Sequence, residues 1–204
     1  YVQYHSKKLN KDGSVEEVEK SEQLGAMWLK WSGRPTFEGM DLDPTGGPVL
    51  PGNVLNLWKG WGVAPAPGAW PLIQRHITDV LASGDARQAE YIFKWAAWAV
   101  QHPERQAEAA LVFRGSKGSG KGTFANAMRR LFGQHGLHIF SSKHLVGQFN
   151  AHLRSCLLLF ADEAFWAGDK QGESTLKGLI TEDTIPIERK GVDVEHCVNR
   201  LHVI

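Results

Sequence analysis

Residues 115–123 have the composition and spacing of a phosphate-binding loop, with glycines and small polar residues ahead of a lysine. Glycines let the backbone wrap closely around an anion, so several N–H groups point at phosphate oxygens while Lys121 supplies a positive charge. Gly122 follows this lysine, so the hydroxyl expected to reach magnesium is that of Thr123. The predicted nucleotide-binding residues are Gly115, Ser116, Lys117, Gly118, Ser119, Gly120, Lys121, Gly122 and Thr123.

A second candidate group follows the apolar run from Cys156 to Ala161, which is typical of a central parallel strand covered on both faces. Asp162 and Glu163 come directly after it. At the carboxyl edge of the sheet, Asp162 is expected near Mg²⁺ and Glu163 where it can polarise an attacking water. Lys121, Asp162 and Glu163 are thus the predicted catalytic residues, and Thr123 and Asp162 the predicted metal ligands. The structural alternative for the acidic pair is a solvated turn or helix cap.

Apolar periodicity predicts the elements that position these residues. One helix begins at Pro71 and ends before Gly84, and a second is capped by Asp85 and ended by Pro103. The remaining predicted elements are a strand at 109–113, a helix at 121–131, a strand at 137–140, a helix at 142–153, a strand at 156–161, a helix at 173–181 and a hairpin of strands 185–189 and 192–198. This order predicts an α/β fold of the P-loop NTPase class, with a parallel sheet and flanking helices.

Composition and punctuation divide the chain and limit its function. Residues 1–70 are predicted to be a loop-rich segment, because many prolines and glycines occur between residues 32 and 71. Residues 71–108 are predicted to form a small helical unit. Residues 109–204 are predicted to form a P-loop ATPase core that is truncated at its C-terminal end. Among 204 residues, 23 Lys and Arg balance 22 Asp and Glu, so no global charge attracts nucleic acid. No apolar run approaches the roughly 20 residues needed to cross a bilayer, so no membrane partner is expected.

The two cysteines, Cys156 and Cys197, lack the CxxC spacing of metal or redox sites, which favours a reducing cytoplasm. The chain begins without Met and ends in an apolar stretch, so it is expected to be a piece of a longer protein.

Several tracts together resemble the superfamily 3 helicase domain of phage and plasmid primase-helicases, relatives of the poxvirus-type primase-helicase. The resemblance runs from about Asn56 to the end, through residues 56–60, 91–103, the phosphate loop, 147–150, the Asp162-Glu163 pair and 176–181. It implies an AAA+-like core that assembles into a homo-oligomeric ring, usually a hexamer, and hydrolyses ATP with Mg²⁺ to move along single-stranded DNA. It also implies a sensor asparagine and an arginine finger, neither of which we assign to a residue.

The hairpin turn is the predicted DNA contact. Arg189 and Lys190 precede the flexible Gly191, and the resemblance places such a basic tip at the pore of a ring. The structural alternative is that Lys and Gly are common at exposed hairpin turns, where they contribute to solubility and contact no DNA. His135 and His138 are spaced HxxH in a turn bounded by glycines, where surface histidines are expected rather than a metal site.

The leading hypothesis is an ATP-dependent DNA helicase or translocase module of a phage or mobile-element primase-helicase, acting in the cytoplasm of a bacterial host. A P-loop phosphotransferase is the second reading, because the loop also resembles that of adenylate kinases. Two features argue against this hypothesis, because adenylate kinases begin at their phosphate loop and carry an Arg-rich lid after it. Here about 110 residues precede the loop, and no Arg-rich lid follows it. A non-hydrolysing nucleotide-dependent scaffold is the third, and Glu163 argues against it because a pure binder needs no acid to polarise water.

Overall fold

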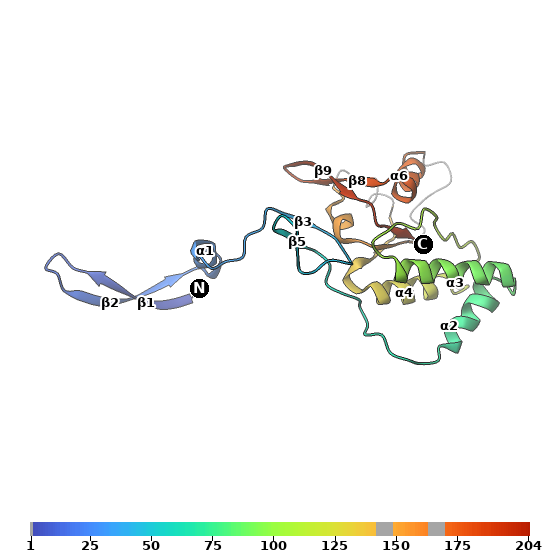
Figure 1. The fold of residues 1–204 in the computed structure, drawn as a ribbon, viewed down its shortest axis with the longest axis horizontal. Coiled ribbons are helices and arrows are strands. Elements are labelled where there is room, and N and C mark those ends of the chain that lie inside the picture. The colour runs from blue at the N-terminus through green and yellow to red at the C-terminus, as the bar shows by residue number, and fades with distance from the viewer. Residues whose placement is uncertain (1, 142–148, 163–169) are drawn as a thin grey trace. The chain divides into compact units, whose positions relative to one another are not determined.

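The computed structural model describes residues 2–141, 149–162 and 170–204, and divides into two compact units, residues 1–38 and 39–204. The predicted boundaries at residues 70 and 108 stay predictions. Figure 1 shows the fold and labels the elements that have room. The strands are β1 (Val2–Leu9), β2 (Val15–Glu22), β3 (Gly39–Asp41), β4 (Val49–Leu50), β5 (Val54–Asn56), β6 (Gly136–Ile139), β7 (Leu158–Ala161), β8 (Thr184–Arg189), β9 (Val192–Val198) and β10 (His202–Val203). The helices are α1 (Leu24–Lys30), α2 (Pro71–Arg75), η1 (His76–Leu81), α3 (Ala86–Gln101), α4 (Lys121–Phe132), η2 (Gly133–His135), η3 (Ala151–Ser155) and α6 (Lys170–Thr181).

The first unit is an antiparallel hairpin followed by a short helix. Strands β1 and β2 pair along their whole length, from Val2 opposite Glu22 to Leu9 opposite Val15. Asp12 closes the turn by accepting hydrogen bonds from the backbone N–H and the hydroxyl of Ser14. The loop-rich description of this region therefore missed a regular hairpin.

The second unit is built on a small parallel sheet in the order β10-β7-β6. The central strand alternates its side chains between two cores, as a strand covered on both faces must. Leu158 and Phe160 belong to the core formed with α3 and α4, whereas Leu159 belongs to the core formed with α6 and the β8–β9 hairpin. The predicted central strand is confirmed, and the fold is mixed α/β (Figure 1).

Two predicted elements differ from the structure. Residues 109–113 form no regular strand. The N–H of Leu111 donates to the carbonyl of Val203 at 3.0 Å, and within the described residues no other backbone hydrogen bond joins this segment to the sheet. The segment lies beside β10 all the same, which keeps it next to the sheet. Of the helix predicted at 142–153, residues 142–148 lie outside the described residues, and residues 151–153 belong to the short 3₁₀ helix η3.

The helices before the loop follow the sequence closely. Asp85 caps α3 by accepting hydrogen bonds from the N–H groups of Arg87 and Gln88, as predicted. The apolar face of α3 buries Ala89, Ile92, Trp95 and Ala99. The preceding helix starts at Pro71 as expected, but continues as the π-helix η1, a form that is rare and often found at functional sites.

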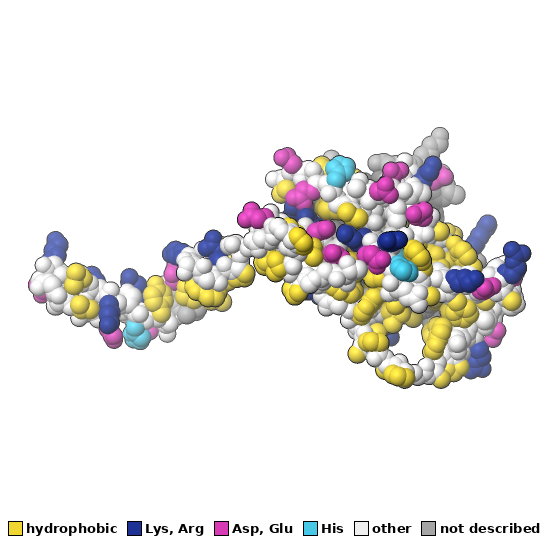
Figure 2. Space-filling model, in the orientation of Figure 1, with side chains coloured by type: hydrophobic (Ala, Val, Ile, Leu, Met, Phe, Trp, Pro, Cys, Tyr) yellow, Lys and Arg dark blue, Asp and Glu magenta, His cyan; other side chains and the backbone are white. Residues whose placement is uncertain are grey.

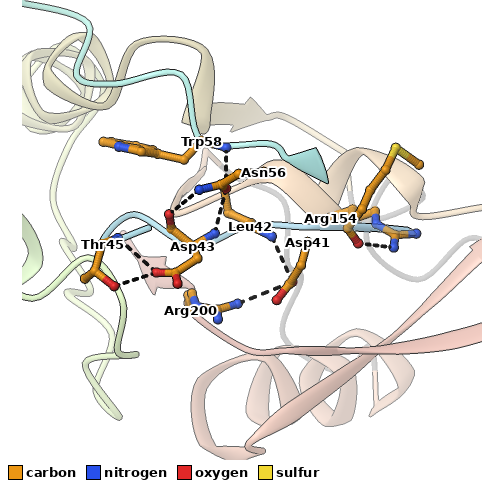
Figure 3. A network of polar contacts seen from close by, with 9 residues as sticks. Asp41, Leu42, Asp43, Thr45, Asn56, Trp58, Arg154 and Arg200 are labelled. Carbon is orange, nitrogen blue, oxygen red and sulfur yellow. Dashed lines mark hydrogen bonds and ion pairs between the residues drawn. The ribbon is translucent and has the colours of Figure 1, made fainter. Parts of the chain in front are cut away.

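A buried asparagine organises the segment that holds β3, β4 and β5 together (Figure 3). The Asn56 side chain is 1% exposed, accepts from the N–H groups of Asp43 and Trp58, and donates to the carbonyls of Asp43 and Gly47. Around it, Arg154 donates to the carbonyl of Met40 at 2.6 Å, and Arg200 lies 3.7 Å from Asp41. These contacts tie η3 and the end of the β8–β9 hairpin to this sheet.

Candidate nucleotide-binding site

The predicted phosphate loop joins residue 114 to the N-terminus of α4, and two glycines give it its shape. Gly118 and Gly120 have φ angles of 79° and 87°, a left-handed region that favours glycine. Gly120 caps the helix without a side-chain acceptor, and the first turn of α4 contains no acid. The positive end of the helix dipole and its N–H groups are therefore not neutralised by a side chain of that turn, which suits an anion.

Lys121 lies folded over this loop. Its Nζ donates to the carbonyl oxygens of Gly115 and Ser116, each at 2.9 Å, and to the hydroxyl of Ser119 at 3.2 Å. Its ammonium group is thus held at the centre of the loop by neutral acceptors. A phosphate that entered the loop would replace these acceptors with charged oxygens, which bind an ammonium group more strongly.

His76 supports the loop from η1, although the sequence gave no reason to select it. Its Nε2 lies 2.9 Å from the carbonyl oxygen of Gly120, and a Cβ atom on Gly120 would be 2.5 Å from the Cε1 atom of the imidazole. The two residues are 44 positions apart in the chain. The glycine is therefore required both by its backbone angle and by the close approach of the histidine.

The other end of α4 meets the segment after β5. The N–H of Gly62 donates to the carbonyl of Leu131 at 2.7 Å, and a Cβ atom on Gly62 would lie 2.2 Å from the carbonyl oxygen of Arg130. Next to it, Trp61 packs edge-on against Phe132, with ring centroids 5.1 Å apart. The C-terminal end of α4 is thus in backbone contact with residue 62.

Asp162 lies at the carboxyl end of β7, where the sequence predicted it. Its backbone N–H bonds to the carbonyl of Ile139 at 2.8 Å, and its side chain is 52% exposed. His138, on β6, stacks on Phe160 with ring centroids 4.4 Å apart and brings its Nε2 within 3.7 Å of the Asp162 carboxylate. Glu163, the other predicted acid, lies outside the described residues.

Two clefts adjoin the loop and share Lys121. One of about 420 Å³ brings together Lys121 and Asp162 with Gly115, Lys117 and Phe160. Another, of about 690 Å³, is lined by Lys121 and Ser119 together with Arg87, Tyr91, Phe113 and Arg114. Among the described residues that line these clefts Thr123 is absent, so the site joins only one of the two predicted metal ligands to the lysine.

The predicted hairpin is present, with β8 and β9 paired antiparallel and Gly191 in the turn at a φ of 74°. Lys190 is exposed at its tip. Arg189 instead donates to the Glu195 carboxylate at 2.9 Å, and Arg154 binds the same carboxylate. The neighbouring guanidinium groups lower the pKa of Glu195, with the Arg154 hydrogen bond as the largest cause. The guanidinium group of Arg189 is therefore already held by a carboxylate of the same hairpin, which it shares with Arg154.

The prediction that both HxxH histidines lie at the surface is wrong for His135, which is 1% exposed. Its Nδ1 contacts the carbonyl of Ser155 at 2.8 Å, and its Nε2 accepts from the N–H of Lys59 at 3.1 Å. Trp58 stacks beside it, with centroids 4.7 Å apart. Burial lowers the pKa of His135, which keeps the ring neutral and able to accept that hydrogen bond. Within the described residues, no group of three or more His, Cys, Asp or Glu side chains could hold a metal ion.

Sequence comparison finds a match to a family of unknown function and homology to a phage DNA primase-polymerase. Residues 113–204 match the model of a family described as a family of unknown function (DUF5906). The chain is also homologous to the DNA primase-polymerase of Nitratiruptor phage NrS-1, to which it is 28% identical over 125 residues. That alignment covers 60% of this chain and 17% of the phage protein.

Structural comparison gives the same relative. The A form apo structure of the NrS-1 C-terminal region matches with a TM-score of 0.74 and 21% identity, covering 99% of this chain and 50% of that one. A second apo structure of that region matches with a TM-score of 0.72 and 22% identity, covering 94% of this chain and 49% of that one. The chain therefore shares the fold of this region and spans about half its length.

These comparisons correct the expected function. The prediction of an ATP-dependent helicase or translocase module is wrong, because the curated relative is a DNA primase-polymerase. The phosphotransferase and scaffold alternatives gain no support either. The comparisons support homology with a phage primase-polymerase, and they do not confirm the predicted resemblance to superfamily 3 helicases. In the part of the chain that the structure describes, none of the helices is both long and apolar enough to cross a bilayer.

Proposed function

We propose that this chain is a nucleoside triphosphate-binding part of a phage-type DNA replication enzyme related to primase-polymerases, with a core of the P-loop class, working in the cytoplasm of a bacterial host. The observation that carries the proposal is the position of the Lys121 ammonium group. It is held by loop carbonyls directly at the N-terminus of α4, with Asp162 on the same cleft. A lysine, the N-terminus of a helix without an acidic side chain in its first turn, and a carboxylate at the adjacent strand end form the set that phosphates and a divalent cation need.

Each part of an ATP molecule has a counterpart in this site. The phosphates fit the loop, where Lys121 exchanges its carbonyl partners for phosphate oxygens. The base and ribose fit the larger cleft, which offers the exposed ring of Tyr91 and the aromatic Phe113 beside the loop. Mg²⁺, which neutralises phosphate charge when bound, fits the exposed carboxylate of Asp162, with Thr123 at the start of α4 as the second candidate ligand.

Single-stranded DNA is the proposed macromolecular partner, at the tip of the β8–β9 hairpin. Lys190 supports this because it is exposed and, among the described residues, forms no ion pair. Arg189 supports it less, because Glu195 already holds its guanidinium group. Contact with phosphates through one lysine per chain would give salt-sensitive binding without sequence preference.

The proposal is tested by titrating the protein with a fluorescent ATP analogue, in Mg²⁺ and in EDTA, and by competing with unlabelled ATP and deoxynucleoside triphosphates. Lys121→Ala removes one or two charge-assisted hydrogen bonds to phosphate, each worth about 1.5–3 kcal/mol, so affinity should fall at least roughly tenfold. Lys94→Ala is the control, because Lys94 pairs with Glu90 on the exposed surface of α3. Equal affinity of wild type and the Lys121 variant for every nucleotide would refute the proposal.

A further inference from the structure

The hairpin of the first unit has few means of stabilising itself. It is a separate two-stranded sheet, so neither outer edge pairs with another strand in the part of the chain that is described. No described residue between 3 and 38 is buried, and the large apolar side chains Leu9, Val15, Leu24, Leu29 and Trp31 are each 57–72% exposed. An isolated two-stranded hairpin is marginally stable in water, so its open edges are places for further strand pairing.

The two edges carry opposite charge. Strand β1 contains Lys7 and Lys8 and no acid, whereas β2 contains four glutamates and a single lysine. Lys7 lies opposite Glu17 and Lys8 opposite Glu16 within the hairpin, but none of these four forms an ion pair among the described residues. Figure 2 shows charged side chains of both signs along this unit. Each strand is thus nearly uniform in sign along its exposed length.

This distribution selects one way of meeting a second copy. A two-fold contact would bring β1 against β1, or β2 against β2. Two strands of the same net charge would then lie side by side, +2 beside +2 or −3 beside −3, which is unfavourable. A head-to-tail contact would bring β2 of one copy against β1 of the next and repeat the register of the hairpin. Lys7 and Lys8 would then lie between glutamates on both sides. Charges that prevent edge pairing in the first arrangement favour it in the second.

We propose that the β1–β2 hairpin is an assembly surface, at which the acidic β2 edge of one copy of this chain pairs antiparallel with the basic β1 edge of the next. A head-to-tail contact of this kind closes into a ring or continues as a filament, depending on the rotation between neighbours. The partner is therefore a second copy of this chain, and the contact consists of backbone hydrogen bonds between strands with lysine–glutamate pairs beside them.

The test compares charge reversals by light scattering coupled to size exclusion, at low and high salt. Wild type should be oligomeric in about 50 mM salt, and its association should weaken roughly tenfold or more in about 500 mM salt. Lys7→Glu/Lys8→Glu and Glu16→Lys/Glu17→Lys should each be monomeric. Lys11→Glu/Lys177→Glu changes the net charge as much as the first variant but lies off the strands, and should assemble like wild type.

The quadruple exchange Lys7→Glu/Lys8→Glu/Glu16→Lys/Glu17→Lys separates assembly from folding of the hairpin. It restores opposite charges within each hairpin and between its own copies, so it should assemble with itself. It should not assemble with wild type, because its β1 edge meets an acidic β2 edge. A monomeric wild type, double variants that remain oligomeric, or free mixing of the quadruple variant with wild type would each overturn the proposal.

Discussion

Gly120→Ala tests how the phosphate loop is held in place. The alanine must adopt a φ of 87°, which costs about 1–2 kcal/mol for a residue with a Cβ atom. The new methyl would also lie 2.5 Å from the Cε1 atom of His76. An imidazole at the end of a side chain can swing away, so the overlap is relieved by losing the 2.9 Å contact with the Gly120 carbonyl. That loss costs about 0.5–1.5 kcal/mol.

The two costs together predict that Gly120→Ala lowers the free energy of unfolding by about 2–3 kcal/mol. His76→Ala, which removes only the contact, should lower it by about 1 kcal/mol. In the double variant the contact is already absent, so only the cost of the backbone angle is added. The double variant should therefore be about as stable as Gly120→Ala alone. The coupling between the two sites is about 1 kcal/mol, above the roughly 0.3–0.5 kcal/mol deviation expected for independent sites.

Urea unfolding followed by circular dichroism measures all four proteins of this cycle, and melting temperatures should fall by about 2–4 °C per kcal/mol in a chain of this size. Gly118→Ala is the matched control. Its φ is 79°, but no atom lies within 4 Å of its Cβ position, so it should carry only the backbone cost and add to His76→Ala. Losses that simply sum in the Gly120→Ala/His76→Ala variant would refute the role of His76 in supporting the loop.

Three further predictions concern the metal, the DNA and pH. Asp162→Asn removes the described carboxylate of the cleft, so the gain in nucleotide affinity from Mg²⁺ should shrink while affinity in EDTA stays near wild type. Lys190→Ala should weaken single-stranded DNA binding and reduce the slope of log affinity against log salt by about 0.7, whereas Arg189→Ala should do less because of its internal ion pair. Burial lowers the pKa of His135 and of His202 from 6.5, so below neutral pH the unfolded chain takes up protons that the folded chain does not. The free energy of unfolding measured in urea should therefore fall as the pH drops from 7 towards 5. The fall should be up to about 1.4 kcal/mol per pH unit for each histidine.

Each of these has an outcome that counts against it. A magnesium response that is unchanged in the Asp162 variant would remove that carboxylate from the metal site. Equal DNA affinities and equal salt slopes for wild type and the Lys190 variant would exclude the hairpin tip as a DNA contact. A urea midpoint that is flat or rises between pH 7 and pH 5 would contradict the burial of neutral histidines.

Local sequence rules anticipated the loop and its helix but not what packs on them. The strand predicted at 156–161, the helix after Lys121 and the Asp85 cap depend on short-range patterns. All three are found in the structure, with the strand covering Leu158–Ala161. His76 could not be predicted, because its contact with Gly120 depends on how η1 packs against a loop 44 residues away. His135 looked like a turn residue because the backbone groups that satisfy its ring, at Lys59 and Ser155, are distant in sequence.

The hairpin at residues 2–22 was missed for another reason. Strand prediction relies on one apolar face, and here charged residues occupy both faces of the two strands. The activity was mispredicted because a glycine-rich loop with a lysine and a following acid predict a class of ligand, and not which reaction the whole protein catalyses.

Helix α4 is held at both ends by segments that precede it in the chain. His76 contacts Gly120, the residue that caps the start of α4, and Gly62 contacts its last turn at a backbone separation that admits no side chain. If the proposed binding of phosphate made α4 slide or rotate, the environment of Trp61 would change, because its ring packs on Phe132 at the end of the helix. In that case Trp61 would be a native fluorescent reporter for the proposed phosphate site, placed a full helix length away from the ligand it would sense.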